Sequence, residues 1–439
     1  MDFFIAFGLF IVSMLAALLT GHSMIYALLV GLVLFLAVGI RRGFSLKALA
    51  HMGWGSIKDS LVVIEVMAII GFITAAWRVS GTITIFVYYG MKVITPPLFL
   101  MITFLLSCLL SYALGTSFGV AGTVGVIFMA LARSGGVSPV LTAGVIMSGI
   151  YFGDRGAPVS SSANMVAGVT GTQIYDNVKL MMKTCILPFA VTLIAYGFLS
   201  FGNPISHVDE AVLRSFEEAF NLSLWSFLPA VLMLLLPLLK ISVTKAMGAS
   251  ILSGILVAWL VQGVSLPTVL VTCITGYQAD GDGLGAILNG GGLVSMLEVV
   301  VILLISCAYS GIFNGTEMLK ELQTKLNQAC TRLGRFSVMV IMSLVSAALF
   351  CNQTIATLMC SDLLERPYLD TGGSRQELAI DMENSVILIA CMVPWCLGCT
   401  VPLTFMNASY SSMPYAIYMY AVPLCYWFTK KRWFPAKGR

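Results

Sequence analysis

The stretch PLFLMITFLLSCLLSYALGTSFGVAGTVGVIFMALA, residues 97–132, is 36 residues long and contains no Lys, Arg, Asp or Glu. A helix that spans a bilayer needs only about 20 apolar residues, so this run holds two segments, or one segment and a re-entrant piece. Backbone polar groups inside a bilayer must bond within the chain, which makes helices the default structure there. The stretch therefore predicts an all-α, polytopic membrane protein.

The same pattern continues along the chain. Of the 439 residues, 59% are hydrophobic and 10% are charged, against roughly 25% charged in soluble domains. Further uncharged runs occur at 3–20, 23–40, 134–153, 184–206, 247–279, 336–361 and 384–429. A β-barrel would show alternating strands of about ten residues instead. Because no basic region precedes residues 3–20, we expect them to form the first span and not a cleaved signal.

Basic residues indicate the orientation. They cluster in loop 41–58, in loop 319–335 and in the tail 430–439, whereas Arg214 is the one basic residue of the polar segment 207–223. Loops rich in Lys and Arg stay on the cytoplasmic side. We therefore expect both termini in the cytoplasm and the segment 207–223 outside. The net charge of +4 is small, so it carries topology information and predicts no nucleic-acid partner.

These constraints divide the chain into two halves of seven spans each. The expected parts are a first repeat at 1–206, an extracytoplasmic linker at 207–223, a second repeat at 224–429 and a basic cytoplasmic tail at 430–439. An odd number of spans gives the halves opposite orientations, which predicts two inverted-topology repeats. Segments 116–132 and 352–362 are too short or too rich in Gly for ordinary spans, and we expect broken or re-entrant helices there.

The halves also echo each other in sequence. Each has an acid inside an apolar helix, Glu65 or Glu298, and then a Ser-Gly pair at 80–81 or 310–311. An acid at this depth is a functional candidate by default, for binding an ion or a proton. The alternative is a protonated carboxyl that holds two helices together.

The first polar break, residues 115–125, places Thr116, Ser117 and Thr123 among four glycines. Glycine permits a helix to unwind, and hydroxyls and freed carbonyls are hard oxygen ligands that suit Na⁺. The alternative is small-residue packing between helices, which needs no ligand.

A second candidate site is the segment 148–164. Asp154 lies at the end of an apolar helix, Pro158 interrupts the chain, and Ser160 and Asn164 follow among several oxygen-bearing side chains. A carboxylate here is costly unless it is used or paired. Its neighbour Arg155 leaves a second interpretation open, a surface ion pair with a structural role.

The third candidate site combines Asn352 and Thr354 with Glu383, which opens a long uncharged stretch. Glu383 is either an ion-binding carboxylate or an acid at a helix N-terminus stabilised by the helix dipole. Asp381 is expected to be a loop charge.

Other chemistry is not indicated. Cys396 and Cys399 form the one Cys-x-x-Cys and lie in an apolar run, and there are three histidines, so no zinc site is expected. Asp280 begins a calcium-like loop, but Gly291 occupies the position of its closing Glu. No phosphate loop, dinucleotide fingerprint or nucleophile–base pair occurs in a credible context, so neither an enzyme nor an ATP-driven pump is predicted. No cofactor is expected beyond a coupling ion, Na⁺ or H⁺.

Several of these segments resemble the NhaC-type Na⁺/H⁺ antiporter family. Residues 115–119 with 122–125 are similar to its Gly-Thr-Ser-aromatic-Gly and Gly-Thr-hydrophobic-Gly segments, and residues 148–155 to its Ser-Gly-x-Tyr-Phe-Gly-Asp-basic segment. In the second half, similar features follow in order at 290–293, 310–312, 383–385 and 394–395. The resemblance implies a secondary transporter of a bacterial inner membrane that exchanges Na⁺ for H⁺. A homodimer stays open.

The resemblance also shows a departure. Where the family usually has an Asp after the Pro-Ser pair, this chain has Ser161. One carboxylate for Na⁺ or H⁺ is therefore missing, and the alternative is Na⁺- or H⁺-coupled transport of a small organic acid or amino acid. The expected ion- or substrate-binding residues are Asp154, Glu383, Thr116, Ser117, Thr123, Ser160, Asn164, Asn352, Thr354, Glu65 and Glu298. Among them, Asp154, Thr116 and Ser160 are the Na⁺ candidates.

Overall fold

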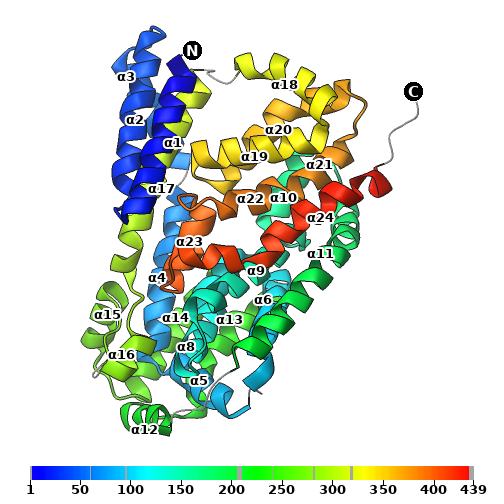
Figure 1. Ribbon diagram of the computed structural model, residues 1–439. Coiled ribbons are helices and arrows are strands. Elements are labelled where there is room, and N and C mark those ends of the chain that lie inside the picture. Colours follow the sequence, from blue (N-terminus) through cyan, green and yellow to red (C-terminus); the bar gives the residue numbers. More distant parts are fainter. Residues whose placement is uncertain are drawn as a thin grey trace.

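The computed structural model describes residues 2–59, 61–93, 96–204, 210–239, 241–279, 282–316 and 320–434. Asp280, residues 205–209 of the expected linker and residues 435–439 of the expected tail lie outside the described residues. Within the described ranges the chain is helical, and its β-structure is one isolated bridge between Tyr277 and Gly290. Figure 1 shows these helices and where the termini lie.

In the first half the helices are α1 (Asp2–Thr20), α2 (Met24–Arg41), α3 (Leu46–Asp59), α4 (Leu61–Val79), α5 (Thr82–Val93), α6 (Phe99–Leu114), α7 (Ser117–Val120), α8 (Val126–Ser134), α9 (Pro139–Gly156), α10 (Ser161–Thr170) and α11 (Ile174–Gly202). Helix α12 (Glu210–Ala219) connects the halves. In the second half they are α13 (Leu228–Leu238), α14 (Val243–Leu260), α15 (Leu266–Thr275), α16 (Asp282–Leu288), α17 (Leu297–Gly315), α18 (Lys320–Leu333), α19 (Arg335–Phe350), α20 (Gln353–Asp370), α21 (Arg375–Glu383), α22 (Val386–Ile389), α23 (Leu397–Phe405) and α24 (Ile417–Trp433).

Several of these helices are long and apolar enough to cross a membrane. Among the described residues they are Met24–Arg41, Ser117–Ser134, Ile174–Gly202, Val243–Leu260 and Leu293–Phe313. The second of them is continuous from α7 to α8 through a π-helical turn at Ala121–Gly125. Counting each of three sharply bent helix pairs as one span raises the number from five to eight in the described part. The prediction of an all-α, polytopic membrane protein is confirmed.

The two halves break their helices in the same way. Helices α6 and α19 are each 16 residues long, and each ends at a left-handed residue, Gly115 (φ 64°) or Cys351 (φ 53°). A positive φ is uncommon for a residue other than glycine, so the backbone turn itself is required at Cys351. The chain then restarts a helix with an N-cap, Thr116 or Asn352, and Asn352 lies 236 residues after Thr116.

This spacing of 236 residues persists to the ends of both halves. It relates helix α4 to α17, and it also relates the pairs Gly136 and Gly372, Ser138 and Ser374, Pro158 and Pro394, and Gly171 and Asn407. Earlier in each half the spacing is shorter, because Ser242 caps α14 219 residues after Ser23 caps α2. The second half therefore carries an extra segment around α16.

Each half covers a helix of the other. Helices α2 and α3 pack on α17, whereas α14 and α15 pack on α4, which occupies the matching place in the first half. These two groups lie toward opposite ends of the molecule in Figure 1. Helices α3 and α18 and the C-terminal end of α24, which carry the basic segments, share one end, and α12 lies at the other.

Close packing of α6 against α9 positions the functional region. A Cβ atom at Gly153 would collide with the backbone of Ser111 and Tyr112. The Ser111 hydroxyl donates a hydrogen bond to the carbonyl of Ile150, one turn along the same face. The end of α9 is therefore held directly against α6, and Asp154 follows Gly153 at that end.

Candidate functional site

Four helices begin at one place in the described part of the chain. Their N-caps are Thr116, Ser160, Asn352 and Cys396, which precede the run Ser117–Ser134, α10, α20 and α23. Three of the caps accept backbone N–H groups through their side chains: Thr116 from Gly119, Ser160 from Ala163, and Asn352 from Thr354 and Ile355. We call these four helix starts, two from each half, the helix-start junction.

A cavity of about 130 Å³ lies at the helix-start junction. Its lining residues are Thr116, Ser117, Phe118, Asp154, Ser161, Ser162, Asn352, Gln353, Thr354, Leu397 and Gly398. Apart from Asp154, these residues are caps or the first two residues of the four helices. The structure thus brings together Thr116, Ser117, Asp154, Asn352 and Thr354, which the sequence analysis had placed in separate motifs.

Asp154 is the charged residue among those that line this cavity. Its side chain is almost fully buried, and its Oδ2 accepts hydrogen bonds from the Ser162 hydroxyl (3.0 Å) and the Gln353 amide (3.1 Å). Ser160 does not line the cavity, but its hydroxyl donates to the backbone carbonyl of Asp154. Because Gln353 starts α20, the carboxylate joins the first half to the second.

The two donors to Asp154 were not singled out in the sequence analysis. Ser162 and Gln353 each stand within two residues of an N-cap, Ser160 and Asn352 respectively. That position after a helix break is the signal that indicates them. The contact itself depends on how the halves meet, which local sequence does not specify.

Arg155 forms no surface ion pair with Asp154, so that interpretation is wrong. Its side chain is fully buried and points elsewhere: one guanidinium nitrogen donates to Asn384 Oδ1 (2.6 Å) and another to the carbonyl of Met181 (3.0 Å). Its guanidinium also lies 5.9 Å from the centre of the Tyr418 ring.

Glu383 is the last residue of α21 and is fully buried, so it is not an acid at a helix N-terminus. Neither carboxylate oxygen has a hydrogen-bond partner among the described residues. Asp381 is not a loop charge either, because it is fully buried within α21 and bonded to Tyr368, Tyr426 and Lys430.

Other predicted residues lie away from the cavity. The Thr123 hydroxyl donates to the carbonyl of Gly119 inside its own helix, and the Asn164 amide caps carbonyls of Pro158 and Ser160 on the exposed side of α10. Both side chains therefore have local structural bonds.

The two acids of the apolar helices are also outside the helix-start junction. Glu65 is exposed on α4. Glu298 is exposed at the start of α17, accepts a hydrogen bond from the Ser23 hydroxyl (2.7 Å) and lines a separate cavity of about 440 Å³. The structure does not bring either carboxylate to Asp154.

The cavity offers oxygen ligands for a monovalent cation. Asp154 supplies a carboxylate, and Ser117, Ser162 and Thr354 supply hydroxyls from the lining. Na⁺ binds hard oxygen ligands of this kind. No cluster of three or more His, Cys, Asp or Glu side chains suitable for a transition metal occurs among the described residues.

Interrupted apolar helices that meet at a buried, single carboxylate define a secondary active transporter of the membrane. Comparison with known proteins gives the particular family. A model of the Na⁺/H⁺ antiporter family matches residues 149–428, and the chain belongs to this family. The sequence resemblance to NhaC-type antiporters is thereby confirmed.

Three relatives illustrate the range of the family. The chain is 26% identical over 376 residues to the malate-2H⁺/Na⁺-lactate antiporter of Bacillus subtilis, covering 84% of this chain and 80% of that protein. It is 28% identical over 380 residues to the Na⁺/H⁺ antiporter NhaC of the same species, covering 84% and 83%. It is 25% identical over 405 residues to the arginine/ornithine antiporter ArcD of Halobacterium salinarum, covering 84% and 83%.

Proposed function

We propose that this antiporter exchanges Na⁺ for H⁺ at Asp154 and carries a small carboxylate-bearing solute in the same cavity. The observation that carries the proposal is the helix-start junction. The first N–H groups of a helix have no intrahelical partner and form the positive end of its dipole. Helix N-termini are therefore sites where a carboxylate binds.

The charge balance of the cavity supports a solute with its own negative charge. Each helix start is equivalent to roughly half a positive charge, so the four together outweigh the single carboxylate of Asp154. A cavity of about 130 Å³ is also larger than one Na⁺ needs.

The same balance couples the solute to a cation. When Asp154 is ionised it repels a bound carboxylate, and when it holds H⁺ or Na⁺ it does not. A solute therefore travels with one of the two cations. Exchange follows, because the carrier that arrives with H⁺ and solute returns with Na⁺ and solute.

We further propose that the halves are inverted repeats which alternate access to the cavity. The constant spacing of helix breaks, the reciprocal cover of α17 and α4 and the two helix starts from each half support this. Repeats of opposite orientation provide two packings of similar energy, one open to each side. The end with the basic segments is the cytoplasmic one, which places both termini in the cytoplasm of a bacterial cell.

Na⁺/H⁺ exchange without a solute is the second candidate. The family model and the relatives named as Na⁺/H⁺ antiporters favour it. The relatives named for malate, lactate, arginine and ornithine favour the first proposal, since each of these molecules carries a carboxylate.

The two candidates separate in proteoliposomes that contain the purified protein and a pH-sensitive dye, acidic inside. NaCl is added outside, alone or with lactate, malate, arginine or ornithine in Na⁺-free form. We expect Na⁺ to release protons about tenfold faster when a transported carboxylate is present. If Na⁺ alone gives the full rate and no carboxylate changes it, exchange needs no solute and the carboxylate proposal is overturned.

Ser161→Asp restores the acid that the family usually has at this position. Ser161 lines the cavity, so a second carboxylate there repels a bound solute carboxylate by several kcal/mol at close range. We expect carboxylate uptake to fall about tenfold or more, and Na⁺/H⁺ exchange without solute to increase. Uptake of radiolabelled carboxylate and dye-based proton flux measure the two effects. Ser161→Asn, of similar size and without charge, is the control and should keep carboxylate uptake.

A further inference from the structure

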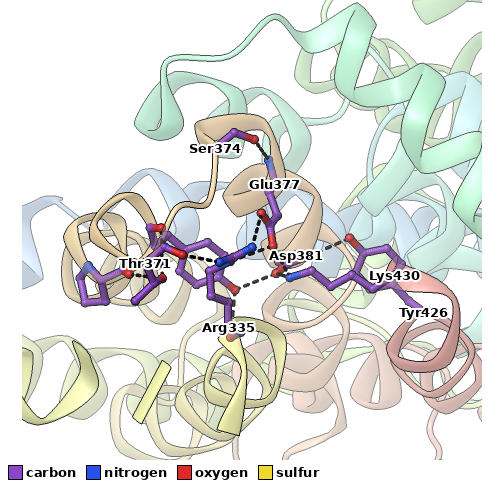
Figure 2. A network of polar contacts seen from close by, with 9 residues as sticks. Arg335, Thr371, Ser374, Glu377, Asp381, Tyr426 and Lys430 are labelled. Carbon is purple, nitrogen blue, oxygen red and sulfur yellow. Dashed lines mark hydrogen bonds and ion pairs between the residues drawn. The ribbon is translucent and has the colours of Figure 1, made fainter. Parts of the chain in front are cut away.

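A buried network of charges lies at the end of the molecule that carries the basic segments (Figures 1 and 2). Arg335 at the start of α19 binds Glu377 with two parallel hydrogen bonds of 3.0 Å. Lys430 of α24 lies 2.7 Å from the same carboxylate and also contacts Asp381. Figure 2 shows Asp381 reached from another side by Tyr426.

The network borders a cavity of about 610 Å³ at this end. Glu377, Arg335 and Lys430 line the cavity, whereas Asp381 lies behind them and is fully buried. Hydroxyls of Tyr368 and Tyr426 each donate to Asp381 over 2.8 Å. Carboxylates, an ammonium and phenols thus follow one another inward from the cavity.

A second group of polar side chains continues from this network to Asp154. Asn384 is three residues after Asp381, which places both on one side of the end of α21. Its Oδ1 accepts from Arg155, the neighbour of Asp154 in α9. Glu383 lies between these groups, and its charge interacts with those of both Arg155 and Asp154.

This second group contains buried polar atoms that no other described residue satisfies. They are both carboxylate oxygens of Glu383, Nδ2 of Asn384, Nε of Arg155 and the Tyr418 hydroxyl. Buried polar atoms in proteins are nearly always hydrogen bonded, to protein or to ordered water. Unpaired atoms contributed by three helices around one arginine therefore identify a place for bound water.

We propose that Glu383 is a relay for protons between the Asp381 network and Asp154. The inference rests on the proposed function, in which Asp154 exchanges H⁺ for Na⁺. It adds a route that protons use and Na⁺ and solute do not. The route begins at the cavity of about 610 Å³, passes Asp381 and Tyr426, and reaches Asp154 through Glu383 and bound water.

The transfer requires no group other than these. A proton that reaches Glu383 neutralises its carboxylate, and it then passes through water to a carboxylate oxygen of Asp154. Glu383 returns to the ionised form, which the positive charge of Arg155 stabilises. Arg155 keeps its own proton throughout, because a guanidinium does not deprotonate in proteins.

The test compares two driving forces in one preparation. Proteoliposomes take up radiolabelled carboxylate driven either by a proton gradient or, at equal pH, by a Na⁺ gradient. Glu383→Gln keeps the shape of the side chain and removes its titration. We expect proton-driven uptake to fall about tenfold or more, and Na⁺-driven uptake to stay within about twofold of wild type.

Two further variants sharpen the result. Tyr426→Phe removes one hydroxyl donor to Asp381 and should slow proton-driven uptake alone. Glu65→Gln makes the same chemical change at an exposed position and should alter neither mode. Normal proton-driven uptake in both Glu383→Gln and Tyr426→Phe overturns the relay. So does an equal loss of both modes in Glu383→Gln, which would place Glu383 in the shared binding site. If wild type shows no cation-driven carboxylate uptake, the proposed function itself fails, and the relay with it.

Discussion

Asp154→Asn is expected to separate solute movement from both cations. The variant carries a permanently neutral side chain at the helix-start junction, so it no longer repels a solute carboxylate and no longer binds H⁺ or Na⁺. We expect uptake driven by a proton or Na⁺ gradient to fall by about a hundredfold. Exchange of labelled for unlabelled carboxylate, which needs no gradient, should persist and lose its dependence on pH and Na⁺.

Asp176→Asn is the matched control for this prediction. Asp176 is exposed in α11, where it pairs with Lys179 at 3.6 Å, and it lies outside the helix-start junction. The control should transport like wild type. Gradient-driven uptake that survives in Asp154→Asn would show that the coupling cations bind elsewhere.

Gly153→Ala is expected to have the largest effect on stability. The added Cβ would meet backbone atoms of Ser111 and Tyr112 in α6, which cannot rotate away as a flexible side chain would. Overpacking of this kind typically costs 1–3 kcal/mol, and the backbone contact places Gly153→Ala at about 3 kcal/mol or more. The thermal unfolding midpoint of the purified protein in detergent should fall, and α9 with Asp154 should lose its position.

Gly197→Ala provides the comparison for this substitution. Gly197 is also inside a helix, α11, and no atom lies within 4 Å of the place where its Cβ would be. Alanine is the better helix former, so this variant should unfold at the wild-type temperature or slightly above it. Equal midpoints for the two alanine variants would contradict the close packing of α6 against α9.

Much of the fold follows from the distribution of charge. Uncharged runs mark the apolar helices, and the polar breaks at Thr116 and Asn352 are helix caps in the structure. Other elements were hidden by the same reasoning. Loop 41–58 contains helix α3, which packs on α17 although it carries Lys47 and Lys58. Its charges indicate an orientation, and they do not reveal that the segment is helical.

The register between the halves could not be obtained from sequence either. The echo matched the Ser-Gly pairs at 80–81 and 310–311, which are 230 residues apart, whereas the backbone repeats at 236 residues from α4 and α17 onward. Small residues recur along apolar helices because they allow close packing. They therefore match at several spacings, and only backbone features such as the left-handed Gly115 and Cys351 distinguish among them.

Part of the candidate site was predictable in the same limited sense. The segment that contains Asp154 was identified from an acid followed by a proline break, and Asp154 does line the cavity. The burial of Asp381 and Glu383 was not predicted, because a charged residue near a helix end is usually at the surface. Here partners from α19, α20 and α24 surround Asp381, and that arrangement exists only in the folded chain.

The most direct measurement of the central proposal is protection of the helix-start junction by a solute. Thr354 lines the cavity and is exposed, so Thr354→Cys should react with a small maleimide, while ten of the eleven native cysteines are buried and the eleventh, Cys425, is half-buried. Unmodified protein measures the background from those native cysteines. We predict that a carboxylate which the protein transports slows the labelling of Thr354→Cys, and does so more strongly at acidic pH or with Na⁺ present. A transported carboxylate that leaves the labelling rate unchanged under all these conditions would contradict the proposal that the solute binds at the helix-start junction.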